Sequence, residues 1–232
     1  SAICQQHNIW LHVDAAYAGS AFILPENQHF LRGIDAVDSF VFNPHKWLMT
    51  NFDCSAYFIQ DADALVNTFA ILPEYLKTST RGKVKDYRDW GIPLGRRFRA
   101  LKLWFVLRSF GVEGLQQQIR HHISLTQQIA SKIEAHPHFK LHIHRMNLLG
   151  FRLHAEGLSN ETLEALNQQL MDELNASGKV YLTHTKMDAK ILLRMVIGAS
   201  HVELHHVEKA WARMSDIGAK LVEGAKQNQQ HA

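Results

Sequence analysis

Residues 9–19 read IWLHVDAAYAG and residues 39–47 read SFVFNPHKW, and these two stretches decide the fold. Each begins as a short apolar run and ends in polar residues, the first run at Asp14 and the second at Asn43. Such runs are typical of buried strands in a parallel sheet. Because ligands gather at the carboxyl ends of strands in open α/β sheets, we expect Asp14 and residues 43–46 to face one pocket.

Further strands and helices are predicted on both sides of these stretches. Residues 1–8 resemble the end of a helix that runs straight into a strand, so we expect the chain to be a piece of a longer one. After a third strand at 55–59 and a helix beginning near Asp61, residues 72–90 form a long polar loop. Loops of that length are usually functional or disordered.

The second half of the chain predicts a small α+β domain. Apolar spacing predicts one helix at 95–110 and another at 112–133. The remaining elements are strands at 140–144, 150–153, 180–182 and 190–197, and helices at 159–176 and 203–225. Ser159 is the expected N-cap of the first of these two helices.

Composition excludes several classes of protein. The chain has 232 residues, 46% of them hydrophobic and 20% charged, which is ordinary for a globular protein. The formal net charge of +3 is spread along the sequence, so we expect no nucleic-acid partner. No apolar run is long enough to cross a membrane. Cys4 and Cys54 give no disulfide framework, which favours a reducing compartment, the cytoplasm.

Two side chains suggest chemistry on an aldehyde cofactor. A buried lysine beside Trp47 would have a depressed pKa, and the neutral amine of Lys46 could then condense with an aldehyde. Asp14 could pair with the ring nitrogen of pyridoxal phosphate (PLP) and keep it protonated, so that the ring accepts electrons. Either residue alone is more often a turn former or a solvated surface residue. The presence of both Lys46 and Asp14 is what favours a cofactor site.

Longer strings then resemble a known family. They are HVDAAYAG at 12–19, NPHKW at 43–47, NFDCSA at 51–56, YLK at 75–77 and DYRDWGIPLGRRFRALKLWFVLR at 86–108. In this order they closely resemble the group II PLP-dependent amino-acid decarboxylases, in particular those acting on aromatic L-amino acids. The resemblance covers the whole chain and is strongest between Trp10 and Gly114.

The resemblance implies a fold and a cofactor site. The fold would be the α/β fold of aspartate aminotransferase-like (fold type I) PLP enzymes, with residues 1–105 completing the cofactor-binding large domain and 106–232 forming the small α+β C-terminal domain. Lys46 would bind the cofactor aldehyde as a Schiff base, and Asp14 would pair with the pyridine nitrogen. Ala16 would pack on the ring, and Asn43 and His45 would lie beside the phosphate.

It also implies a role for the polar loop and for partners. In this family the loop closes over the active site, often that of the partner subunit, and its tyrosine corresponds to Tyr75. A phenol there can protonate the substrate carbon after carbon dioxide leaves. Relatives with phenylalanine at that place tend to make aldehydes, so Tyr75 favours decarboxylation to the amine. We expect a homodimer, and an N-terminal half that supplies the remaining cofactor and substrate contacts.

Several alternatives stay open. Within the family, the chain could belong to an aromatic aldehyde synthase or to a decarboxylase of glutamate, histidine or diaminobutyrate. Outside the enzymes, it could be a catalytically silent binding domain. Arg194, in the strand predicted at 190–197, could hold a substrate carboxylate or form a structural ion pair. The histidine pairs lack an acidic partner at ligand spacing, so we expect no metal.

Overall fold

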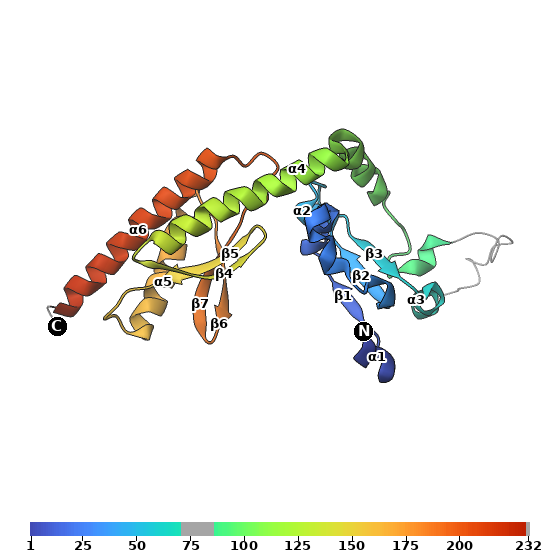
Figure 1. Cartoon of the computed structure of the whole chain (residues 1–232), viewed down its shortest axis with the longest axis horizontal. Coiled ribbons are helices and arrows are strands. Elements are labelled where there is room, and N and C mark those ends of the chain that lie inside the picture. Colours follow the sequence, from blue (N-terminus) through green and yellow to red (C-terminus); the bar gives the residue numbers. More distant parts are fainter. Residues whose placement is uncertain (71–85, 231–232) are drawn as a thin grey trace. The chain divides into compact units, whose positions relative to one another are not determined.

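The computed structural model describes residues 1–70 and 86–230, and Figure 1 traces them. The chain divides into two compact units, Ser1–Gln116 and Gln117–Ala232. This division falls within the longest helix, later in the chain than the predicted domain boundary after residue 105. The assignment of 1–105 to a cofactor domain and 106–232 to a small domain remains a prediction.

The N-terminal unit is built on a three-stranded sheet in the order β1-β2-β3 (Figure 1). Strand β1 (His12–Asp14) is parallel to β2 (Ser39–Phe42), which is antiparallel to β3 (Ala56–Ile59). All three strands agree with the prediction to within a few residues. The described helical segments are α1 (Ala2–Gln6), η1 (Ala18–Ile23), η2 (Pro25–Leu31), η3 (Ile34–Ala36), α2 (Pro44–Trp47), α3 (Ala62–Phe69) and η5 (Tyr87–Trp90).

A helix cap, a ring stacking contact and a close glycine contact hold some of these short elements in place. The Asp61 carboxylate accepts a hydrogen bond from Ala64 N (2.9 Å) and so caps α3. The Trp47 ring is fully buried and stacks on Tyr17, with ring centroids 5.3 Å apart, which joins α2 to the segment after β1. A Cβ on Gly19 would lie 2.5 Å from Phe42 Cβ, so only glycine lets η1 pack this closely on β2.

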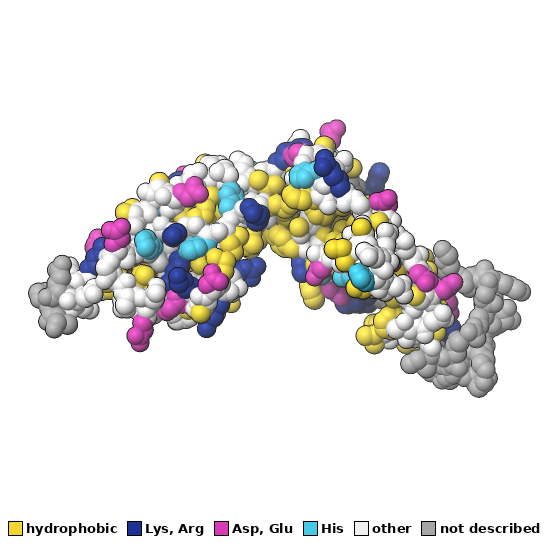
Figure 2. Space-filling model, turned by 60° about the horizontal axis from the view of Figure 1, so that its bottom comes forward, with side chains coloured by type: hydrophobic (Ala, Val, Ile, Leu, Met, Phe, Trp, Pro, Cys, Tyr) yellow, Lys and Arg dark blue, Asp and Glu magenta, His cyan; other side chains and the backbone are white. Residues whose placement is uncertain are grey.

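Helix α4 (Arg99–Ala135) contains two helical stretches joined at Gly111. Gly111 has φ 63° and ψ 176°, outside the helical region. The predicted break between residues 110 and 112 is therefore confirmed. Phe98, just before α4, and Trp104 and Phe105 near its start are each more than half exposed. Hydrophobic side chains are also visible at the surface in Figure 2.

The C-terminal unit packs helices against a four-stranded antiparallel sheet in the order β4-β5-β7-β6 (Figure 1). Its elements are β4 (Phe139–Arg145), β5 (Leu148–Leu153), α5 (Asn160–Ala176), β6 (Thr183–Met187), β7 (Lys190–Val196) and α6 (Leu204–Gln230). Fully buried Ile129, Leu149, Phe151, Leu170 and Leu193 belong to its core. Ser159 caps α5 as predicted, since its hydroxyl accepts from Thr162 N.

One predicted strand of this unit is wrong. Residues 180–182 are not a strand, and β6 begins at Thr183. Leu182 is bonded instead to the Asn175 side chain, which accepts from Leu182 N (2.7 Å) and donates to Leu182 O (3.0 Å). The β6–β7 turn is formed by Asp188 and Ala189, both with positive φ. Helix α6 also extends beyond its predicted end at residue 225.

Candidate active site

The parallel pairing of β1 and β2 brings the predicted site residues to one sheet edge. Asp14 is in register with Val41. Just beyond, Ala15 N donates to Val41 O (3.0 Å), and Asn43 N donates to Ala16 O (3.0 Å). The carboxyl ends of the two strands therefore carry Asp14, Ala16 and Asn43 next to one another, as the strand pattern predicts.

Asp14 is held by its own turn. The side chain is exposed, and its Oδ1 accepts a hydrogen bond from Ala16 N at 2.9 Å. The bond makes a local Asx turn, which is the common structural role of an aspartate in this position. Within the described residues the second carboxylate oxygen, Oδ2, makes no hydrogen bond. One oxygen is thus fixed by the backbone while the other remains available.

Lys46 lies three residues beyond Asn43, in α2. Its backbone N–H donates to Asn43 O (2.9 Å), and its side chain is exposed. The expectation of a buried lysine is therefore wrong. Neighbouring residues of a helix point about 100° apart, and Trp47 takes the inward position, which leaves Lys46 facing outward. Among the described residues, Lys46 Nζ has neither an ion pair nor a hydrogen bond.

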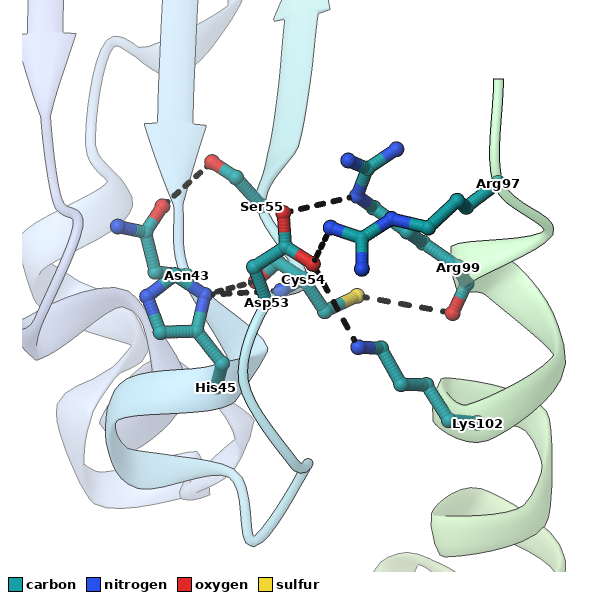
Figure 3. A network of polar contacts seen from close by, with 8 residues as sticks. All are labelled: Asn43, His45, Asp53, Cys54, Ser55, Arg97, Arg99 and Lys102. Carbon is teal, nitrogen blue, oxygen red and sulfur yellow. Dashed lines mark hydrogen bonds and ion pairs between the residues drawn. The ribbon is translucent and has the colours of Figure 1, made fainter. Parts of the chain in front are cut away.

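Asn43 and His45 contact the loop that leads into β3 (Figure 3). Asn43 Oδ1 accepts from Ser55 Oγ at 2.5 Å. His45 Nδ1 lies 2.6 Å from Cys54 O and 3.0 Å from Cys54 N. Both side chains thus anchor this loop beside the sheet edge. Their predicted place next to a phosphate stays a prediction, and the second ring nitrogen of His45 has no partner among the described residues.

Asp53 organises the other side of the same loop, and sequence reasoning missed it. Its carboxylate lies 2.7 Å from Arg97 Nη2, 3.0 Å from Arg99 Nε and 3.8 Å from Lys102 Nζ (Figure 3). Burial alone would raise the pKa of Asp53, but the hydrogen bond from Arg99 and the charges of Arg97 and Arg99 hold it below its ordinary value. The sequence shows the basic cluster at 96–99 but not which of 22 acidic residues meets it.

Cys54, beside Asp53, is a free thiol in this network. It is buried, and burial raises the pKa of the thiol. Cys4 is also free, as the absence of a disulfide framework predicts. The described residues contain no group of three or more His, Cys, Asp or Glu side chains able to hold a metal ion.

Two further predicted residues are Tyr75 and Arg194. Tyr75 lies outside the described residues. Arg194 belongs to the C-terminal unit, where it is half-buried on β7 opposite Gly150 and Thr183. It forms no ion pair with any described residue, and its contact with a substrate stays a prediction. No helix in the described part of the chain is long and apolar enough to cross a membrane.

The residues at the sheet edge fit pyridoxal phosphate. The cofactor needs an anionic partner for its ring nitrogen and a primary amine for its aldehyde. Asp14 offers a free carboxylate oxygen, and Lys46 offers an amine without a partner among the described residues. The small side chain of Ala16, half-buried between the strand ends, leaves room for a flat ring.

Comparison with known proteins agrees with this chemistry. The family profile described as the pyridoxal-dependent decarboxylase conserved domain matches residues 1–154. An aromatic-L-amino-acid decarboxylase of Mus musculus is 44% identical over 228 residues, which are 97% of this chain and 46% of that protein. The chain therefore spans about half the length of the curated relatives it matches.

Solved structures show the same fold. The structure of Oryza sativa TDC with PLP and tryptamine matches 95% of this chain and 46% of that chain with a TM-score of 0.89 at 37% identity. The Catharanthus roseus tryptophan decarboxylase, in complex with L-tryptophan, matches 95% of this chain and 46% of its own with a TM-score of 0.85 at 39% identity. The expected fold and cofactor are confirmed, and the chain belongs to the pyridoxal-dependent decarboxylase family.

Proposed function

We propose that this chain forms part of an enzyme that removes the α-carboxyl group of an aromatic L-amino acid, giving the amine and carbon dioxide. The observation that carries the proposal is the meeting of Asp14, Ala16 and the segment that leads to Lys46 at one edge of the β1–β2 pair. When bound, pyridoxal phosphate supplies an electron sink for the bond that breaks.

Each of the site residues of this chain would have its own role in binding the cofactor or moving a proton. Lys46 Nζ would bind the aldehyde carbon of the cofactor, and the free Oδ2 of Asp14 would hold a proton on the ring nitrogen. Asn43 and the second ring nitrogen of His45 would donate hydrogen bonds to the phosphate. Ala16 would support the flat face of the ring, and Tyr75 would deliver a proton to the substrate carbon.

An aromatic substrate is supported by the relatives. The Mus musculus protein is named for aromatic L-amino acids, and the Catharanthus roseus enzyme is described with L-tryptophan. Tyr75 favours the amine over the aldehyde as product. Two free cysteines favour a reducing compartment, so we place the protein in the cytoplasm.

We further propose that activity requires an N-terminal half and a second copy of the subunit. The chain spans less than half the length of its Mus musculus relative. Phe98, just before α4, and Trp104 and Phe105 near its start expose aromatic surface. Contiguous apolar surface of this kind is typical of protein contacts.

Covalent trapping tests the cofactor site. The chain, co-expressed with an N-terminal half from a close relative, is loaded with pyridoxal phosphate, reduced with borohydride and digested for mass spectrometry. We expect the cofactor on the peptide that contains Lys46. Lys46→Ala should abolish this label, whereas Lys209→Ala, which removes an exposed lysine of the C-terminal unit, should retain it. A label that spreads over several lysines and survives Lys46→Ala would contradict the proposal.

A substrate screen tests the reaction. The same assembly is offered L-tryptophan, L-tyrosine, L-glutamate, L-histidine and L-diaminobutyrate, and the products are identified by mass spectrometry. An amine formed from the aromatic substrates supports the proposal. An aldehyde with peroxide would favour an aldehyde synthase, and turnover of glutamate, histidine or diaminobutyrate alone would reassign the substrate. If the trapped, folded assembly turns over none of them, the silent binding domain is the better description.

A further inference from the structure

The C-terminal unit contains a cavity lined by charged and apolar side chains, and none of its lining residues is assigned to the cofactor. Its volume is about 350 Å³. Small-molecule sites usually measure about 300–1,000 Å³, so this cavity has room for a small metabolite. The side chains that matter for its chemistry are Lys140, His142, Arg152, His154, Glu156 and Lys190.

The sheet gathers basic residues at this cavity. Lys140 on β4 is directly opposite Arg152 on β5. Like charges in directly opposed cross-strand positions are destabilising. Lys190 is the first residue of β7 and lines the same cavity. His142, at a β-bulge between Leu141 and Ile143, also lines it. The cavity therefore gathers three cationic side chains, of which Arg152 is ion-paired with Glu164 and the two lysines form no ion pair with any described residue.

Arg152 is one of the residues that line the cavity, and it has an unused donor. The residue is only 4% exposed. Its Nη2 donates to Glu164 Oε1 at 2.7 Å, and its Nε donates to Leu153 O at 3.4 Å. Its Nη1 is buried and has no hydrogen-bond partner within the part of the chain that the structure describes. A buried charged donor left unpaired is costly, and native proteins almost always satisfy it.

The acidic residues nearby do not satisfy this donor. The second oxygen of Glu164 accepts from Ile191 N at 2.8 Å, so both of its oxygens are engaged. Glu156 lines the cavity but forms no ion pair with any described residue. Lys140 and Lys190 likewise have no ion-pair partner in the described part of the chain.

Basic side chains outnumber the one acidic side chain, Glu156, among the described residues that line the cavity. The pKa of His142 lies below its ordinary value because of burial first, and then because of repulsion from Lys140, Arg152, Lys190 and His154. A metal cation would be repelled by the same charges. An anion would be attracted, above all by Lys140 and Lys190, which form no ion pair with any described residue.

We propose that this cavity binds a small molecule through a phosphate group, with Arg152 Nη1 as the buried anchor and Lys140 and Lys190 as flanking charges. A guanidinium offers planar, charge-assisted hydrogen bonds that match phosphate oxygens. Inorganic phosphate and a phosphorylated metabolite share this chemistry. The site does not involve Asp14 or Lys46, so its test is independent of the test of the proposed decarboxylase activity.

Nuclear magnetic resonance of the histidine rings tests the site in the full chain. Sodium phosphate is titrated at constant ionic strength against sodium chloride, and the signals of His142 and His154 are assigned with His→Gln variants. We expect saturable shifts of both signals and a rise in the pKa of His142 as phosphate binds. A phosphorylated sugar, compared with the parent sugar, tells whether an organic phosphate binds more tightly than inorganic phosphate.

Charge-matched variants make the test specific. Lys140→Gln combined with Lys190→Gln should weaken phosphate binding by at least about tenfold, since a hydrogen bond to a charged group contributes that factor or more. The control combines Lys179→Gln with Lys209→Gln, two exposed lysines of the same unit that do not line the cavity. This control should bind phosphate as the parent chain does.

Arg152→Lys, which keeps the charge but loses the planar donor pair, should also weaken binding. Three results would overturn the proposal: shifts that do not saturate, equal weakening by the control pair, or shifts at His45 in place of His142. The His142 signal in the parent chain decides the question even if a cavity variant fails to fold.

Discussion

A single carboxylate, that of Asp53, links the candidate site to the rest of its unit. Asn43 and His45 bind the loop before β3 through Ser55 and Cys54. Asp53, in the same loop, binds Arg97 and Arg99 at the start of α4. One loop thus ties the sheet edge to the helix, and the charge of Asp53 contributes to the position of both.

Replacing Asp53 with asparagine should loosen this link. We expect Asp53→Asn to lower the midpoint of thermal unfolding of the N-terminal unit by a few degrees at pH 7, followed by circular dichroism. Because the pKa of Asp53 is lower in the folded state, its contribution is present above the ordinary aspartate pKa of about 4 and is lost as pH falls below it. The variant should therefore lose less stability than the parent on acidification.

Asp35→Asn is the matched control, because Asp35 is exposed and its carboxylate has no partner among the described residues. If both variants respond alike to pH, Asp53 has no special part in holding the loop.

The residues of the site differ in how far the sequence could predict them. Asp14, Ala16 and Asn43 follow directly from two apolar runs, because parallel strands end at one edge. The exposure of Lys46 could not be predicted in the same way, since it depends on the inward position of Trp47 and on which residues cover the edge. The Asp53 contacts join residues that are more than 40 positions apart, and no local pattern identifies such a pair.

At the element scale, Gly111 decides the course of α4. Its φ of 63° and ψ of 176° lie in a region of the backbone map that is essentially restricted to glycine. A Cβ at this position would meet no atom of the described residues within 4 Å, so a substitution would be opposed by the backbone conformation. Gly114, in the following helical stretch, would bring a Cβ only to ordinary contact with Phe110, at 3.5 Å.

Replacing these two glycines with alanine should change the stability of the chain in opposite directions. Gly111→Ala should destabilise the chain by about 1–3 kcal/mol, the usual cost of holding another residue in this region. Gly114→Ala should stabilise it by about 0.5–1 kcal/mol through helix propensity. Urea unfolding followed by circular dichroism measures both changes. A destabilisation of similar size in both variants would mean that packing, and not the conformation of Gly111, governs this part of α4.

Most elements could be predicted because their signals are local. The break in α4, the helix that begins near Asp61, the cap Ser159 and strand β2 all follow from short patterns. Residues 180–182 could not be predicted, because a strand-like apolar run there is bonded to the side chain of Asn175 instead of to a neighbouring strand. A tertiary hydrogen bond in this case outweighs the local preference for a strand.

At the scale of the whole molecule, the two compact units carry different ionisable groups. The N-terminal unit contains Asp53, whose protonation lowers the stability of the fold only near pH 4 and below. The C-terminal unit contains His122 on α4, which is fully buried and whose Nε2 donates to Ala199 O at 3.1 Å. Burial first, and then the neighbouring His121, lower the pKa of His122, although the bond to Ala199 opposes this shift.

The C-terminal unit should therefore weaken at a higher pH than the N-terminal unit. A histidine whose pKa is lower in the folded state binds its proton more readily in the unfolded chain, so stability is complete above the ordinary histidine pKa of about 6.5 and falls as pH drops below it. His122→Gln should cost about 1 kcal/mol at pH 8 through the altered hydrogen bond, and should flatten the decline between pH 7 and pH 5. Urea unfolding across this range, with exposed His184→Gln as control, measures the difference. If the parent and both variants show the same slope, His122 is not the group that links protonation to unfolding, and the acid sensitivity of this unit arises elsewhere among its histidines.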